Sequence, residues 1–204
     1  WDINSVSPAL HVNLWMMGQD NRELYVVDAP PTTLREDITP KQINKSPETT
    51  PTLIVRQNGI NGKKHPFVSV FEPYATGEKS IEKITKVGDF GDMVSLKVTS
   101  THSTQVICNS IDGNTVYKPA KNLKFKGTLG VASEKNGKFD YLYLGKGKLL
   151  QNGKYKIEAV NEAVSAALRI EDGKYYYSSD KPVIIQINKK GAKEYPAGYN
   201  LEIK

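Results

Sequence analysis

Cysteine is almost absent from this chain of 204 residues. Its one cysteine, Cys108, can form no internal disulfide, and no second thiol stands at metal-ligand spacing. We therefore expect Cys108 to be a small, buried apolar residue. Histidine is also scarce: the chain has three, and none belongs to an HxH or HExxH arrangement. The sequence predicts no metal site and no cofactor.

Long apolar runs and nucleotide-binding motifs are missing as well. The mean hydropathy is −0.48, and no apolar run approaches the ~18 residues of a membrane-spanning helix. No GxSxG, P-loop or helix-opening GxGxxG occurs. These absences argue against a membrane span, a serine hydrolase of the α/β type and a nucleotide-binding enzyme.

Arginine makes up only four of the 28 basic residues, although the net charge is +6. Proteins that read nucleic acid rely on arginine for bidentate contacts. The lysines here are spread along the chain and interleaved with acidic residues. We therefore expect no nucleic-acid partner. A mildly basic surface suits an acidic polysaccharide through long-range attraction.

Helical periodicity is absent, and strand-like alternation takes its place. In the segment 10–17, Leu10, Val12, Leu14 and Met16 are expected on one face and His11, Asn13, Trp15 and Met17 on the other. The fold class that we predict is all-β, an antiparallel β-sandwich or meander with multiple hairpins and little or no helix. Further strands are expected in the segments 23–27, 52–57, 66–72, 93–100 and in a series from TQVICNS to PVIIQIN.

Asn-Gly and Asp-Gly pairs separate many of these strands. They favour two-residue hairpin turns because they tolerate positive φ angles. Another such signal, between 57 and 62, predicts a hairpin that joins the strands 52–57 and 66–72. The four remaining turn signals are IDGN (111–114), KNGK (135–138), QNGK (151–154) and EDGK (171–174).

The domain organisation follows from the same pattern. We predict a single β-sandwich-type region over residues 1–204, with a possible subdivision near 100–115. The segment 28–51 is rich in Pro and Thr and lacks periodicity, so it is expected to be a long surface loop. Because the chain begins at Trp1 without a methionine, we expect that a leader has been removed or that the chain belongs to a longer protein.

The stretch RQNGINGKKHPFVSVFEPY, residues 56–74, combines side chains that could bind an anion or move a proton. Arg56, His65, Glu72 and Tyr74 are its candidate site residues. Prolines bound its second strand, and the basic residues gather at the predicted turn, where exposure to solvent explains them without chemistry. No residue is assigned a catalytic role.

Tyrosine is the one enriched aromatic residue, with 11 copies. Tyrosine rows on a sheet can stack on sugar rings, because a flat apolar face matches a pyranose while the hydroxyl stays hydrated. Ordinary cross-strand packing is the alternative. The candidate carbohydrate-binding residues are Tyr141, Tyr143, Tyr175, Tyr176, Tyr177, Arg56, His65, Glu72 and Tyr74.

Several phrases, HVNLWMMG, TLIVRQNG, HPFVSVFEPY, YLYLGKGK and YYYSSDKPV, resemble the C-terminal β-sandwich region of heparinase II/III-type polysaccharide lyases. The resemblance covers residues 1–188. It implies a β-elimination enzyme for uronic-acid polysaccharides, in which a helical toroid precedes the β region. This chain has neither a toroid nor the HxHxD motif of that family, so no catalytic role is carried onto His11.

Three function classes follow. The first is a non-catalytic C-terminal β domain that supports or contacts acidic polysaccharide for a toroid catalytic domain located upstream or on a separate chain. The second is a stand-alone carbohydrate-binding module, and the third is a small enzyme with a site around His65, Glu72 and Tyr74. We expect that the chain is not an enzyme by itself. The family resemblance implies a periplasmic or secreted location.

Overall fold

The computed structural model describes the backbone of residues 2–3 and the segments 7–29, 49–58, 66–88, 91–188 and 191–203. Every regular element in these segments is a β-strand, and every strand pair that they form is antiparallel. The prediction of an all-β, antiparallel fold without helix is confirmed for this part of the chain. None of it contains a helix that could cross a membrane.

The chain forms two compact units, one of residues 1–17 and 66–204 and the other of residues 18–65. The smaller unit contains a two-stranded sheet, β3 (Arg22–Ala29) and β4 (Thr50–Gln57). The predicted loop 28–51 therefore has strand residues at both ends, and its central part, 30–48, lies outside the described residues.

The predicted hairpin between segments 52–57 and 66–72 is wrong. Strand β4 pairs with β3, with Leu24 opposite Val55, whereas β5 (Ser69–Ala75) pairs with β2 (Leu10–Met16), with Asn13 opposite Glu72. Alternation shows which residues share a face but not which strand lies beside them, so a strong turn signal suggested the wrong partners. Residues 59–65 of that expected turn lie outside the described segments.

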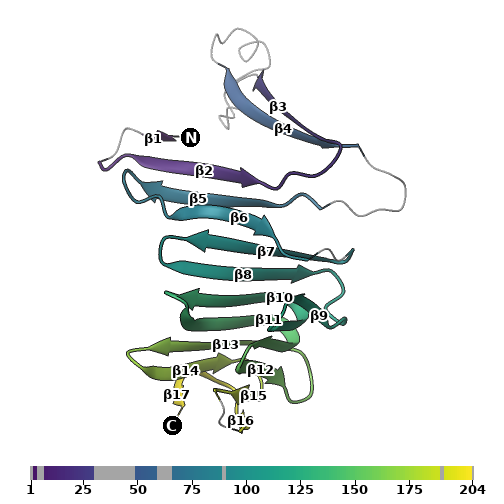
Figure 1. Cartoon of the computed structure of the whole chain (residues 1–204), viewed down its shortest axis with the longest axis vertical. Helices are drawn as coiled ribbons and strands as arrows, with labels where there is room; N and C mark the ends of the chain where they lie inside the picture. The colour runs from purple at the N-terminus through teal and green to yellow at the C-terminus, as the bar shows by residue number, and fades with distance from the viewer. Residues whose placement is uncertain are drawn as a thin grey trace, which may run out of the picture. The chain divides into compact units, whose positions relative to one another are not determined.

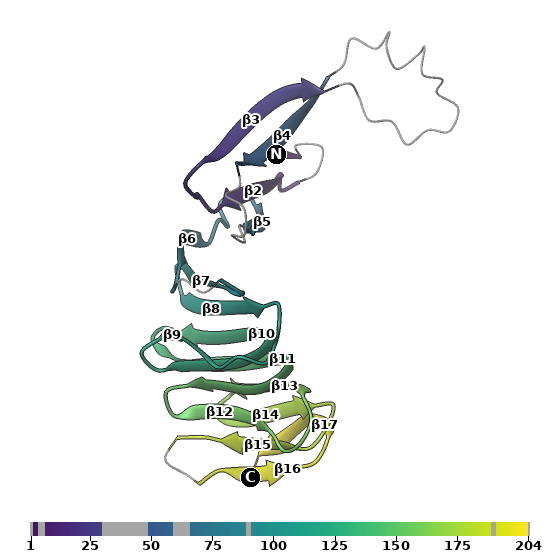
Figure 2. The same cartoon turned by 90° about the vertical axis from the view of Figure 1, so that its right-hand side faces the viewer.

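The larger unit contains a three-stranded sheet, β1 (Asp2–Ile3), β2 and β5, and a twelve-stranded sheet. Figures 1 and 2 follow the strands of the large sheet from β6 to β16. The segment 100–115, in which a subdivision was expected, contains β8. This strand pairs with both β7 and β10, so the large sheet continues across the segment. The strands of the large sheet are β6 (Ile81–Lys86), β7 (Met93–Ser100), β8 (Ser103–Ser110), β9 (Tyr117–Ala120), β10 (Leu123–Lys135), β11 (Lys138–Asn152), β12 (Tyr155–Ala159), β13 (Val164–Glu171), β14 (Lys174–Ser179), β15 (Val183–Gln186), β16 (Lys193–Tyr195) and β17 (Gly198–Ile203).

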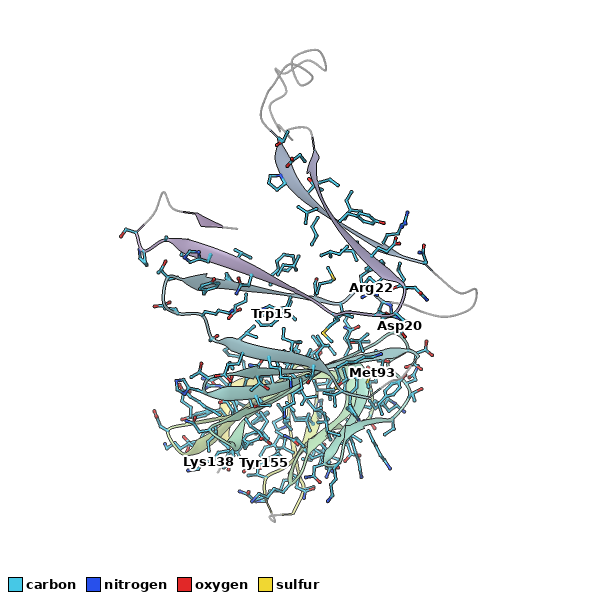
Figure 3. The ribbon with its side chains drawn as sticks, turned by 45° about the horizontal axis from the view of Figure 1, so that its top comes forward. Trp15, Asp20, Arg22, Met93, Lys138 and Tyr155 are labelled. Carbon is cyan, nitrogen blue, oxygen red and sulfur yellow. The ribbon has the colours of Figure 1, made fainter. Side chains whose placement is uncertain are left out.

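The long ribbon of β10 and β11 curls back on itself. Glu134 and Asn152 belong to opposite ends of this ribbon, yet the Asn152 amide donates a hydrogen bond of 3.3 Å to the Glu134 carboxylate. Phe139 at one end of β11 stacks on Tyr155, just beyond the other end, with ring centroids 3.8 Å apart. Figure 3 labels Lys138, the first residue of β11, and Tyr155, the first residue of β12. The curl lets β11 pair with β13 along one half and with β12 along the other.

Glycines make the curl possible. Gly127 and Gly147 are paired across the ribbon at a register shift. A Cβ on Gly127 would lie 2.7 Å from the Gly147 Cα, and one on Gly147 would lie 2.8 Å from the Lys126 carbonyl oxygen. Both distances are too short for real atoms, so the two backbones can approach only without side chains.

Substituting Gly147→Ala is therefore expected to lower the free energy of unfolding by about 1–3 kcal/mol, because the added methyl group must force the strands apart. Gly91→Ala is the matched control, since a Cβ there meets no atom within 4 Å. Urea unfolding followed by tryptophan fluorescence measures both variants. Equal stability of the two would contradict the close approach of the strands.

Most of the hydrophobic core comes from the second half of the chain, although Met93 of β7 also belongs to it. Fully buried side chains come from β10, β11, β12, β13 and β15: Phe125, Leu142, Leu144, Leu150, Ile157, Leu168, Val164 and Val183. Cys108 is 1% exposed, which confirms the expectation of a buried cysteine. Burial raises the pKa of its thiol to about 11.

Two of the predicted turns are confirmed as two-residue hairpins. Asn136 and Gly137 have φ angles of 51° and 71°, and Asp172 and Gly173 have φ angles of 51° and 77°. These pairs join β10 to β11 and β13 to β14. Positive φ at both central positions is the geometry of a type I′ turn.

The other two turn signals behave differently. At QNGK, Asn152 pairs with Tyr155, so the turn is Gly153–Lys154, one residue later than predicted. IDGN forms no tight hairpin, because β8 and β9 each pair with β10 instead of with one another. There the Asp112 carboxylate accepts hydrogen bonds from the backbone N–H groups of Asn114 and Thr115, which stabilises a wider loop.

Candidate carbohydrate-contacting face

Strand alternation places two of the candidate tyrosines on the outside of β11. Leu142 and Leu144 are fully buried, so the neighbouring Tyr141 and Tyr143 point to the opposite face of the strand. Tyr143 is 38% exposed. A Cβ on Gly145 would lie 3.3 Å from the Tyr143 ring, so this ring lies along the sheet, over a residue without a side chain.

The three consecutive tyrosines of β14 are divided between the two faces. Tyr177 is 4% exposed, and its hydroxyl donates a hydrogen bond of 3.2 Å to the Pro196 carbonyl oxygen. A ring buried in this way is not available to a sugar. Tyr175 shares the inner face, whereas Tyr176 points outward with Ser178.

Tyr175 belongs to an inner aromatic cluster that closes the curl. Its hydroxyl lies 3.5 Å from that of Tyr155 and accepts a hydrogen bond of 3.4 Å from the Asn188 amide. Burial, followed by the contact with Tyr175, raises the pKa of Tyr155 to about 12. These rings pack against the core with Phe139, so their position is explained by folding alone.

The register of the sheet brings the outward tyrosines together around an arginine. Tyr141 lies opposite Arg169 of β13, and Arg169 lies opposite Tyr176 of β14. Tyr143 lies two residues further along β11, on the same face of the strand, opposite Ala167. We call Tyr141, Tyr143, Arg169 and Tyr176 the outer aromatic face.

Arg169 is held in place on this face by three neighbours. Its guanidinium carbon lies 5.1 Å from the centre of the Tyr176 ring, close enough for a cation–π contact. One terminal nitrogen donates a hydrogen bond of 2.8 Å to the Asn200 side-chain oxygen, and the other pairs with the Glu171 carboxylate. The arrangement holds a positive charge over one side of the Tyr176 ring.

The electrostatics of Tyr141 keep its hydroxyl protonated. Burial raises its pKa, and the nearby Asp140 carboxylate adds to the effect. A neutral phenol can donate a hydrogen bond to a sugar hydroxyl or to an anionic group. The raised pKa thus leaves the Tyr141 hydroxyl able to donate a hydrogen bond and makes it unsuited to act as a base at neutral pH.

Glu72 lies elsewhere, on β5 in the three-stranded sheet. It is 5% exposed. One carboxylate oxygen accepts hydrogen bonds from the side chains of Asn13 and Trp15, and the other from the backbone N–H groups of Ser80 and Ile81. Burial alone would raise the pKa of Glu72, but these four donors outweigh it and lower the pKa below its usual value. The carboxylate is thus a structural link between β5 and the start of β6.

Tyr74 is on the same face of β5 as Glu72. Its ring stacks on His11 with centroids 5.1 Å apart, and its hydroxyl donates a hydrogen bond of 3.5 Å to the Asn13 side-chain oxygen. The third residue of the candidate enzyme site, His65, lies outside the described segments. Within the described segments, no three His, Cys, Asp or Glu side chains gather in a group that could hold a metal ion.

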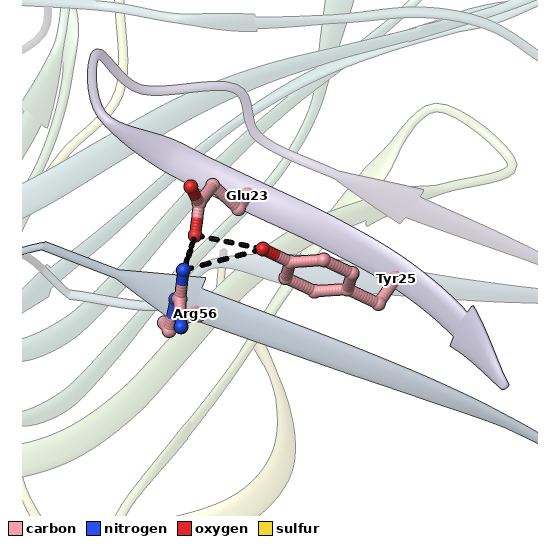
Figure 4. A network of polar contacts seen from close by, with 3 residues as sticks. All are labelled: Glu23, Tyr25 and Arg56. Atoms are coloured by element: carbon pink, nitrogen blue, oxygen red, sulfur yellow. Dashed lines mark hydrogen bonds and ion pairs between the residues drawn. The ribbon is translucent and has the colours of Figure 1, made fainter.

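Arg56 belongs to the smaller unit and pairs with Glu23 across β3 and β4 (Figure 4). Its Nε donates a hydrogen bond of 2.6 Å to Glu23, and the Tyr25 hydroxyl donates one of 3.0 Å to the same carboxylate oxygen. Arg56, followed by Tyr25, lowers the pKa of Glu23. The charge of Arg56 is thus already matched by a neighbouring carboxylate.

Comparison with known proteins adds to this geometry. Residues 78–170 match the family described as the endo-acting ulvan lyase C-terminal domain, a segment that includes Tyr141, Tyr143 and Arg169. The chain is similar to the C-terminal domain of a polysaccharide lyase. The similarity is to an ulvan lyase and not specifically to the heparinase II/III type that the sequence phrases suggested.

An endo-acting ulvan lyase from Formosa agariphila is 30% identical over 159 residues, which cover 74% of this chain and 18% of that protein. The chain therefore spans about a fifth of the length of this relative. The similarity concerns a small part of a much larger polypeptide.

Sequence reasoning missed Arg169 and Asn200 as members of the candidate face. Arg169 could have been found: the Asp-Gly turn of EDGK pairs Glu171 with Lys174, and counting back two residues places Arg169 opposite Tyr176. Asn200 could not, because β17 pairs with β14 through a register shift that no local signal marks.

Proposed function

We propose that this region is a non-catalytic C-terminal domain of a polysaccharide lyase and that it contacts the polysaccharide through its outer aromatic face. The observation that carries the proposal is the cross-strand row Tyr141–Arg169–Tyr176, with Tyr143 beside it. Ulvan, for which the relative is named, is the first polymer to test. The catalytic step belongs to another part of the protein or to a separate chain.

Physical chemistry supports this use of the face. A tyrosine ring offers an apolar plane to a sugar, and its hydroxyl remains in water. An arginine forms directed, charge-assisted hydrogen bonds with carboxylate or sulfate groups. Both features lie on the paired strands β11, β13 and β14, so little backbone freedom is lost when a polymer lies across them.

The proposal that the region is non-catalytic is supported by the hydrogen bonding of Glu72. A general base must be free to accept a proton from the substrate. Four donors already occupy this carboxylate, and its lowered pKa makes it a weaker base than an ordinary glutamate.

For the catalytic part we propose the helical toroid of heparinase II/III-type lyases, on the strength of the resemblance in the strand phrases. We also propose that the protein works outside the cytoplasm, in the periplasm or after secretion, on the strength of the similarity to a polysaccharide lyase. A reading frame for a helical toroid, fused or adjacent to the coding sequence, would support the proposed catalytic part.

Removing a ring from the face is the direct test of carbohydrate contact. Tyr176→Ala and Tyr143→Ala are each expected to weaken binding to ulvan about three- to tenfold, the value of one aromatic contact. Affinity electrophoresis in ulvan-containing gels measures the change.

Tyr25→Ala is the matched control, since Tyr25 is 42% exposed but belongs to the smaller unit. Its affinity is expected to equal that of the unaltered chain. Equal losses in all three variants, or no retardation of the unaltered chain by ulvan, would refute the proposed face.

A further inference from the structure

Arg169 and Glu171 stand two residues apart on β13, so both side chains point to the outer face. They form an ion pair in which the side chains are 41% and 56% exposed. Ion pairs so accessible to water contribute little to stability, because solvent competes with each partner. The pair therefore holds Arg169 in position without binding it firmly to the carboxylate.

We propose that Arg169 binds an anionic group of the polysaccharide, a carboxylate or a sulfate ester, and that Glu171 occupies the position of that group until the polymer displaces it. The inference rests on the proposed function, because it concerns the same face. It adds to that function the residue that contacts the anionic group and a competing residue of the chain itself.

The geometry around Arg169 suits such an exchange. A guanidinium has five N–H donors in a planar fork, and the fork matches two oxygens of one anion. Asn200 holds one terminal nitrogen at 2.8 Å, and the ring of Tyr176 supports the guanidinium from one side. When Glu171 moves away, these two contacts keep the fork in place for the incoming anion.

A second charge pair on the same face provides a control. Lys174 of β14 donates a hydrogen bond of 3.2 Å to Glu202 of β17, and both side chains are partly exposed, 59% and 38%. Glu202 lies opposite Tyr176, so it is close to Arg169 in the sheet. Glu202→Gln changes the net charge of the face as much as Glu171→Gln does. It leaves the ion pair between Arg169 and Glu171 intact.

The experiment measures binding of the full chain to three polymers by affinity electrophoresis: polygalacturonate with carboxylates, dextran sulfate with sulfate esters, and neutral dextran. Glu171→Gln is expected to strengthen binding to an acidic polymer about two- to fivefold, since the competitor is removed. Arg169→Gln is expected to weaken that binding and to leave dextran unaffected. Glu202→Gln is expected to change it less than Glu171→Gln does. Comparison of polygalacturonate with dextran sulfate identifies the anion.

Three results would overturn the inference: unchanged or weaker binding in Glu171→Gln, equal gains in Glu171→Gln and Glu202→Gln, or equal losses for acidic and neutral polymers in Arg169→Gln. If Tyr176→Ala still weakens binding to ulvan in these cases, the proposed function stands and only the role of the pair is wrong. If the unaltered chain binds neither ulvan nor any of the three polymers, both are wrong. Thermal unfolding of each variant confirms that the fold is retained.

Discussion

Phe125→Ala is expected to lower the free energy of unfolding by about 3–5 kcal/mol, because it deletes a fully buried aromatic ring. The ring is fully buried in β10 and packs against Gly130 further along the same strand, where a Cβ would lie 2.7 Å from it. Its removal leaves a cavity at the centre of the curl. Urea unfolding of the full chain measures the loss, and Phe71→Ala, at a ring that is 60% exposed, is the control.

A double-mutant cycle separates this contact from general damage to the core. Gly130→Ala alone should destabilise the protein, because its methyl group collides with the Phe125 ring. In the Phe125→Ala background the same methyl group enters the vacated space, so its cost should disappear or change sign. Additive effects of the two substitutions would show that the ring does not lie over Gly130.

Glu72→Ala is expected to cost about 3 kcal/mol of stability, because it leaves the partly buried donors of Asn13, Trp15, Ser80 and Ile81 without an acceptor. Glu162→Ala, which removes an exposed partner of Lys181, is expected to leave the stability almost unchanged, because water already competes for this ion pair. Chemical denaturation of both variants makes the comparison. A loss no larger than that of Glu162→Ala would contradict the structural role of this carboxylate.

The pH dependence of stability tests the same carboxylate independently. The pKa of Glu72 is lower in the folded protein than its ordinary value of 4.5. A group of this kind stabilises the fold at pH values above its unfolded pKa, and the contribution is lost as the pH falls through the folded pKa. Glu72→Gln should therefore lose less stability than the unaltered chain between about pH 5 and pH 3. Parallel pH profiles would contradict the lowered pKa.

The sequence predicted local turns better than distant strand partners. The turns KNGK and EDGK set the register of the hairpins that join β10 to β11 and β13 to β14, as predicted. Strand partners distant in the sequence were not predictable. Leu24 lies opposite Val55 and Asn13 opposite Glu72 because of tertiary packing, for which the local pattern carries no information.

The candidate face was only partly predictable for a related reason. Tyr141, Tyr143 and Tyr176 were chosen from composition, and the sheet places them on one side. Tyr175 and Tyr177 were chosen on the same grounds but point inward, because successive residues of a strand alternate between its faces. The curl of β10 and β11 depends on glycines whose close approach becomes visible only in three dimensions.

Titration of the chain with ulvan oligosaccharides, followed by the NMR signals of the tyrosine ring protons, shows directly whether polysaccharide contacts the outer aromatic face. We expect shifts for Tyr141, Tyr143 and Tyr176, which lie on the face, and none for Tyr177, whose ring is buried. Shifts confined to tyrosines away from the face, or no shifts at saturating oligosaccharide, would contradict this contact.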